Sequence, residues 1–151
     1  MKVHGTLLAS IALMISLPVL AADWPPIVSE RIARAKAAVK TVEMVALKSA
    51  VDKKESVLIL DVREADEYQS GYIPGAINIP RGMLEMKIWK HVGYPDKLDT
   101  SRKIYVYCLT SGRSALATET LTQLGFTNAY LVNMHLDEWK KAGYPLDGDG
   151  L

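Results

Sequence analysis

The chain has few of the features on which several classes of protein depend. Its 151 residues include a single cysteine, which excludes an internal disulfide. Basic and acidic residues nearly balance, at 18 and 17, so no net charge attracts nucleic acid or an anionic membrane. We find no internal repeat, low-complexity tract or second domain. The length suits one domain with its own hydrophobic core.

The first 22 residues have the layout of a secretory signal peptide. Lys2 and the amino terminus form a short basic region, residues 6–17 are apolar, and Pro18 is followed by the small residues Ala21 and Ala22. An uncleaved anchor is the alternative, but the uncharged stretch 5–22 is borderline for spanning and contains Pro18. We therefore predict cleavage, a bacterial periplasmic location and no membrane association afterwards. The remaining chain would carry 17 basic and 17 acidic residues.

Short apolar runs alternate with helix-like segments along the rest of the chain. We expect an extended leader over 23–26 and a loop over 93–100. The expected strands are 57–60, 76–79, 104–107 and 129–132. The expected helices are 30–37 capped by Ser29, a second capped by Thr41 and reaching Ala50, then 64–69, 83–90, 114–124 and 136–141. This alternation predicts an α/β fold, with a central parallel β-sheet and helices on both faces.

The only cysteine lies where an apolar strand gives way to a helix. Cys108 follows the run 104–107 and opens the loop 109–113. Unpaired N–H groups and the positive end of the helix dipole favour a thiolate at this position, and Arg113 adds a permanent positive charge. An inert buried cysteine is the alternative. Ligands bind at the carboxyl ends of parallel strands, where both Cys108 and Asp61 fall, so we interpret Cys108 as reactive.

Several separated motifs resemble a single-domain rhodanese from about residue 38 to 146. They are Asp61-Val62-Arg63-Glu64, Glu67-Tyr68, the stretch 71–80, the Cys108 loop, and Trp139 with Gly143-Tyr144-Pro145. The resemblance implies a rhodanese-like domain over 38–146, preceded by an extension over 23–37 with a short helix and followed by a tail over 147–151.

The resemblance also implies sulfurtransferase activity. Cys108 would be the nucleophile that takes a sulfane sulfur from a thiosulfate-like anion, releases sulfite and passes the persulfide sulfur to a thiophilic acceptor, cyanide in the usual assay. The loop that surrounds the sulfur would be Leu109, Thr110, Ser111, Gly112 and Arg113. No metal or organic cofactor is implied, and a thiol protein is a further candidate partner.

The physical properties of the Cys108 loop are consistent with sulfur transfer, but they leave two alternative functions open. A thiolate attacker and an anion-binding ring of amides suit sulfur transfer, Thr110 and Ser111 add hydroxyl donors, and Arg113 would bind the oxyanion or brace the loop. A non-catalytic sulfur carrier or regulatory module is the first alternative. A phosphatase or arsenate reductase is less favoured, because four residues separate Cys108 from Arg113, whereas related cysteine phosphatases have five.

Other residues are interpreted as supports of the loop. We expect Asp61 and Arg63 to form a buried brace behind it, and Glu67 to pair with Arg63 or cap a loop. Met134-His135 stands where the family commonly has Gly-Gly. The bulkier residues would narrow the mouth of the site or alter the choice of donor, and His135 would be an acid–base group or a structural histidine. Tyr72 replaces a largely structural histidine of the family motif. The helix near 30–40 is either a solvated helix packed on the domain or a partner-docking element.

Overall fold

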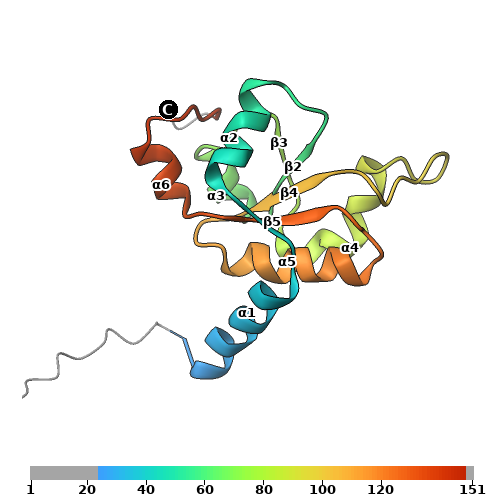
Figure 1. Cartoon of the computed structure of the whole chain (residues 1–151), viewed down its shortest axis with the longest axis horizontal. Coiled ribbons are helices and arrows are strands. Elements are labelled where there is room, and N and C mark those ends of the chain that lie inside the picture. Colours follow the sequence, from blue (N-terminus) through green and yellow to red (C-terminus); the bar gives the residue numbers. More distant parts are fainter. Residues whose placement is uncertain (1–23, 149–151) are drawn as a thin grey trace, which may run out of the picture.

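The computed structural model describes residues 24–148, so the predicted signal peptide lies outside the described residues (Figure 1). Within that range the chain forms a five-stranded sheet in the order β1-β5-β4-β2-β3. Every neighbouring pair is parallel. The strands are β1 (Thr41–Glu43), β2 (Leu58–Asp61), β3 (Ala76–Asn78), β4 (Ile104–Tyr107) and β5 (Ala129–Asn133). The predicted α/β class with a central parallel sheet is confirmed.

Helices cover both faces of the sheet. They are α1 (Pro26–Ala38), α2 (Met44–Asp52), α3 (Ala65–Gln69), α4 (Leu84–Lys87), α5 (Gly112–Gln123) and α6 (Leu136–Lys141), with 3₁₀ turns at Arg81–Met83 and Ile88–His91. In this described part of the chain, no helix is long and apolar enough to cross a membrane.

The central strands β2 and β4 are buried on both faces, which explains their continuous apolar sequences. Alternate side chains point to opposite faces. On β4, Ile104 and Val106 pack against residues of α4 and α5, while Tyr105 and Tyr107 pack against residues of α2 and α6. Two hydrophobic cores therefore lie on either side of the sheet.

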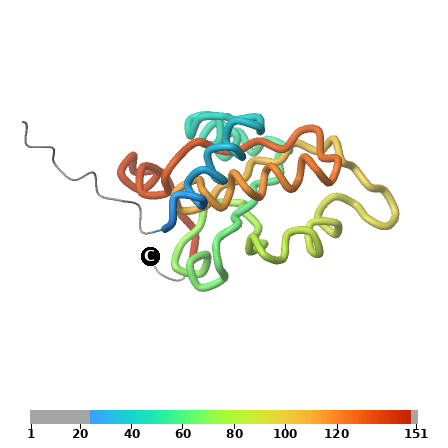
Figure 2. Tube along the Cα trace, turned by 90° about the horizontal axis from the view of Figure 1, so that it is seen from below, coloured from blue at the N-terminus to red at the C-terminus, as the bar shows by residue number. Residues whose placement is uncertain are grey.

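Helix α1 lies outside these two layers, against α5 (Figures 1 and 2). Ala35 is fully buried there, in a small cluster with Ala115 and Leu131. Arg31 forms an ion pair with Glu119 of α5. The interpretation of this segment as a solvated helix packed on the domain agrees with these contacts.

Four predicted element boundaries were wrong. Helix α1 begins at Pro26 rather than after Ser29, because the fixed φ of proline suits a first helical turn. Thr41 does not cap a helix but opens the edge strand β1, which pairs with β5. The segment 83–90 forms a short α-helix between two 3₁₀ turns, and α5 begins two residues earlier than expected, at Gly112. The remaining predicted strands and helices are present within one residue.

Candidate active site

Cys108 lies at the carboxyl end of β4, directly before the loop that enters α5. Its neighbour Tyr107 stands in register with Asp61 of β2, so the two strand ends meet at one edge of the sheet. Cys108 is only 2% exposed. The backbone N–H of Ser114 donates a hydrogen bond to Cys108 Sγ at 3.4 Å, and Ser114 Oγ lies 3.4 Å from the same sulfur. The sulfur thus faces the first turn of a 12-residue helix, where the helix dipole favours negative charge.

The loop 109–113 presents backbone donors without protein acceptors. No group within residues 24–148 accepts a hydrogen bond from the backbone N–H groups of these five residues. Ser111 adopts the left-handed conformation, with φ +64°, and its carbonyl accepts from the Ala115 N–H at 3.1 Å. A left-handed residue among successive N–H groups is typical of an anion-binding nest.

Arg113 is committed to an ion pair. Its Nη1 and Nη2 donate to the Glu67 carboxylate at 2.5 and 2.7 Å. The hydrogen bond from Arg113 is the main reason that the pKa of Glu67 falls to about 2, and the same contact raises the pKa of Arg113. Of the two roles expected for Arg113, the geometry agrees with bracing the loop.

Glu67 also caps the start of its own helix. Its carboxylate accepts a hydrogen bond from the backbone N–H of Glu64 at 3.0 Å. Of the two roles expected for Glu67, the structure shows a capping contact, whereas its side chain does not pair with Arg63, which contacts Glu67 only at the backbone carbonyl, at 2.9 Å.

Asp61 and Arg63 form a buried brace, as expected from the sequence. They are 0% and 3% exposed. Arg63 Nη2 and Nε donate to the Asp61 carboxylate at 2.6 and 3.0 Å. Arg63 also donates to the carbonyls of Glu67 and Gly71 at 2.9 and 2.8 Å. Because this brace holds α3, and Glu67 of α3 holds Arg113, the pair supports the cysteine loop through α3.

Sequence reasoning missed two residues at the loop. The first is Ser114, whose position in the first turn of α5 was the available signal. The second is Lys36 of α1, whose Nζ donates to Ser111 Oγ at 2.6 Å. Ser111 is 2% exposed, whereas Thr110 is exposed. No local motif marks Lys36, which is reached only once α1 is placed against α5.

A mostly apolar cavity of about 480 Å³ lies between α1 and the cysteine loop. Its lining residues are Trp24, Val28, Ile32, Leu109, Thr110, Gly112, Arg113 and Leu116. Ile32 approaches closely, because a Cβ built on Gly112 would lie 3.2 Å from Ile32 Cδ1. Glycine at the start of α5 therefore permits the close docking of α1.

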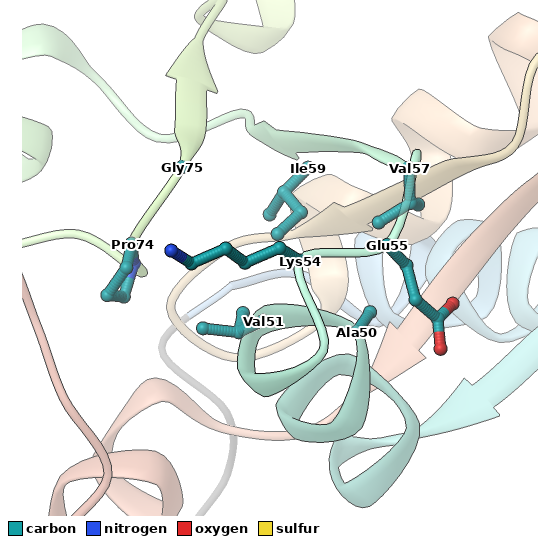
Figure 3. A pocket seen from close by; sticks show the side chains of 8 residues that line it. All are labelled: Ala50, Val51, Lys54, Glu55, Val57, Ile59, Pro74 and Gly75. Atoms are coloured by element: carbon teal, nitrogen blue, oxygen red, sulfur yellow. The ribbon is translucent and has the colours of Figure 1, made fainter.

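A second cavity, of about 390 Å³, lies between α2 and the Pro74–Gly75 turn. Figure 3 shows Lys54 extending across it towards Pro74, while Glu55 points away. Glu55 instead pairs with Lys103 at 3.5 Å. No cysteine, serine or threonine lines this cavity, and no group of His, Cys, Asp and Glu suited to a metal ion occurs among residues 24–148.

The structure shows the contacts of the residues that differ from the usual rhodanese motifs. Tyr72 stacks on Tyr68, with ring centroids 4.0 Å apart. Met134 is buried in the core, so the prediction that it narrows the mouth does not match its position. His135 is exposed, and its backbone N–H donates to Glu138 at 2.8 Å. The next residue, Leu136, donates its N–H to the Leu109 carbonyl at 2.9 Å, which ties α6 to the cysteine loop.

Comparisons with known proteins define the family. The sequence profile of the rhodanese-like domain matches residues 43–142. The chain therefore belongs to the rhodanese-like family, and helix α1 precedes the matched region. Among solved structures, the rhodanese-related protein of Thermoplasma volcanium superposes with a TM-score of 0.59 at 33% identity, covering 73% of this chain and 99% of that one.

The names of two bacterial relatives indicate different functions, sulfur carriage and sulfur transfer. The putative sulfur carrier protein YrkF of Bacillus subtilis is 34% identical over 98 residues, which cover 65% of this chain and 49% of that protein. The thiosulfate sulfurtransferase PspE of Escherichia coli is 39% identical over 69 residues, which cover 46% of this chain and 62% of that protein. The chain thus spans about half to three-fifths of the length of these relatives.

Proposed function

We propose that this protein is a sulfurtransferase that carries a sulfane sulfur on Cys108 from a thiosulfate-like donor to a thiophilic acceptor. The observation that carries the proposal is the sulfur of Cys108 at the first turn of α5, beside a loop of unengaged N–H groups. The name of PspE supports thiosulfate as the donor. No metal or organic cofactor takes part in the proposed cycle.

In the first step the Cys108 thiolate attacks the outer sulfur of thiosulfate. A new S–S bond forms to Cys108, the S–S bond of thiosulfate breaks, and sulfite leaves with that electron pair. The free N–H groups of residues 109–113 would stabilise the negative charge of donor and persulfide. The Ser114 N–H, which already donates to Sγ, would favour the thiolate before attack.

In the second step a nucleophile attacks the outer sulfur of the persulfide. With cyanide, a C–S bond forms, the S–S bond breaks, and its electron pair returns to Cys108 as the thiolate, giving thiocyanate. A thiolate acceptor would form an acceptor persulfide by the same displacement. A thiol protein partner remains part of this proposal.

Sulfur carriage without rapid turnover is the second candidate, and the name of YrkF favours it. A phosphatase or arsenate reductase is less favoured. The oxyanion substrate of either enzyme would need an arginine that is free to bind it, whereas both terminal nitrogens of Arg113 donate to the Glu67 carboxylate.

The test is formation of thiocyanate from thiosulfate and cyanide by wild type and Cys108→Ser. We expect turnover by wild type alone, with no release of phosphate from p-nitrophenyl phosphate. Sulfur bound to Cys108 without turnover would favour the carrier, and phosphatase activity that is lost in Cys108→Ser would contradict the proposal.

We also propose export to the periplasm, which rests on the pattern of residues 1–22. The test is the amino-terminal sequence of the protein recovered from the periplasmic fraction of a bacterium expressing the full chain. A chain that begins near Ala22 or Asp23 is expected, whereas an intact amino terminus in the membrane fraction would contradict export and cleavage.

A further inference from the structure

We propose that Lys36 of α1 supplies the uncompensated positive charge of the Cys108 loop, and that it positions this loop for an anionic sulfur donor. The inference rests on the proposed function for its substrate, but the reactivity of Cys108 tests it separately. It assigns a role in the site to a helix that precedes the rhodanese-like match over residues 43–142.

The cation expected at the loop is already neutralised. Arg113 shares both of its terminal nitrogens with the two oxygens of Glu67, at 2.5 and 2.7 Å. A paired guanidinium and carboxylate carry no net charge, so their combined field at the sulfur is much weaker than that of a lone cation. Arg113 can hold the loop in place, but the pair offers little attraction to a dianion.

Lys36 reaches the same loop from α1, and no carboxylate among residues 24–148 pairs with it. Its Nζ donates to Ser111 Oγ at 2.6 Å. Lys36 is half-buried, and Ser111 is 2% exposed. A cation partly shielded from water acts more strongly on a nearby anion than an exposed one.

The partner of Lys36 is the residue that shapes the loop. Ser111 has φ +64°, a conformation that costs energy for a residue with a side chain and that the surroundings must hold. The hydrogen bond from Lys36 is one such constraint, and the Ser111 carbonyl accepting from Ala115 is another. Lys36 therefore both charges the loop and helps to fix the residue that turns its N–H groups.

Other charged groups around the loop are paired or exposed. Glu67 is bound to Arg113, Glu119 to Arg31, and Asp61 to Arg63. Glu64 at the start of α3 and His135 before α6 are both exposed. All of these groups are present in every Lys36 variant, so a difference between the variants reports on Lys36.

The experiment compares Lys36→Gln, Lys36→Arg and the matched control Arg34→Gln in the full protein. Arg34 lies on the same helix, and its side chain is 61% exposed, so its loss removes one positive charge away from the loop. Glutamine retains a hydrogen-bond donor without the charge, and helix propensity changes little in all three variants. Lys36→Met serves as a second uncharged variant, and thermal unfolding reports whether each variant folds.

The first readout is the rate of alkylation of Cys108 by iodoacetamide at about pH 6.5 and about pH 9, which needs no sulfur donor. We expect the rate at the lower pH to fall roughly threefold to tenfold in Lys36→Gln and Lys36→Met, and to change by less than about twofold in Lys36→Arg and Arg34→Gln. We expect the rates of the variants to differ less at the higher pH than at the lower pH.

The second readout is steady-state turnover of thiosulfate with cyanide. We expect the KM for thiosulfate to rise roughly threefold to tenfold in Lys36→Gln, with kcat changed less and with a weaker dependence of KM on salt than in wild type. Alkylation profiles of Lys36→Gln that coincide with those of Arg34→Gln would overturn the role of Lys36. Absence of turnover in wild type would contradict the proposed function, while the alkylation result would still decide on Lys36.

Discussion

Arg113 and Glu67 are joined by two hydrogen bonds of 2.5 and 2.7 Å across 46 residues of sequence. The pair connects the first turn of α5 with α3, and α3 is in turn held by the buried Asp61–Arg63 brace. The loop that follows Cys108 is therefore fixed from the side of β2 by a continuous set of polar contacts. A carboxylate 46 residues away in sequence therefore holds the residue that closes the cysteine loop.

The Glu67–Arg113 pair predicts a dependence of stability on pH. The pKa of Glu67 is lowered from 4.5 to about 2, so its carboxylate stabilises the fold above 4.5 and this contribution is lost as the pH falls towards 2. Because both side chains are about a third exposed, at 30% and 33%, we expect about 1 kcal/mol. Denaturant unfolding at about pH 6 and about pH 3 should show a smaller pH effect in Glu67→Gln than in wild type.

The control for that experiment is Glu30→Gln. Glu30 pairs with Arg34 at 3.8 Å, and both side chains are more than 60% exposed, at 62% and 61%. Its loss should leave the pH dependence close to that of wild type. Equal pH dependence in wild type and Glu67→Gln would contradict the assigned contact.

Removing one member of the buried brace should be costly. Arg63→Met removes the guanidinium that pairs with the Asp61 carboxyl group, which is 0% exposed, and we expect the free energy of unfolding to fall by about 3 to 5 kcal/mol. In the double variant Asp61→Leu, Arg63→Met, which removes both charges, part of this loss should be recovered. Urea titrations measure both values, and a loss of less than about 1 kcal/mol in Arg63→Met would rule out the brace.

Ser114 offers a test of the contacts to the sulfur. Its hydroxyl lies 3.4 Å from Cys108 Sγ, and its backbone N–H donates to the same atom. Ser114→Ala removes only the hydroxyl, so we expect alkylation of Cys108 at about pH 6.5 to slow by about threefold to tenfold without loss of the fold. Thr122→Ala, which removes a hydroxyl bound to a carbonyl of the same helix, should leave alkylation unchanged. Equal rates in both variants and wild type would mean that the hydroxyl does not act on the thiolate.

The docking of α1 predicts coupling between Gly112 and Ile32. A Cβ at position 112 would lie 3.2 Å from Ile32 Cδ1, so Gly112→Ala should destabilise the protein by about 1 to 2 kcal/mol through overpacking. Ile32→Val removes the Cδ1 methyl group that this Cβ would approach. The double variant should therefore be more stable than the sum of the two single changes implies. If the changes in unfolding free energy of the two single variants simply add in the double variant, the docking of α1 against the start of α5 is contradicted.

The sequence predicts those parts of the fold that depend on local pattern. Strands β2 and β4 were recognised because burial on both faces requires a continuous apolar run. Strand β1 was missed because it has three residues at the sheet edge, with only Val42 partly buried, and its register with β5 is set by tertiary contact. The predicted start of helix α1 was too far along the chain, because Pro26, which can open a helix, was interpreted as part of an extended leader.

The same limit applies to the site. Cys108 and its loop follow from their place after a strand, which is visible in the sequence. The partners that set the charge of the loop are not visible there, because Lys36 and Ser111 are separated by 75 residues and Arg113 and Glu67 by 46. The pairing with Glu67 favours one of the two roles expected for Arg113, bracing the loop, while Lys36 provides the open charge.

The most direct test of sulfur transfer is the intact mass of the reduced protein before thiosulfate, after thiosulfate, and after subsequent cyanide. Wild type should gain the mass of one sulfur atom from thiosulfate and lose it to cyanide as thiocyanate appears, while Cys108→Ser should gain nothing. A folded, reduced wild type that takes up no sulfur, or a Cys108→Ser variant that takes up as much as wild type, would contradict the account.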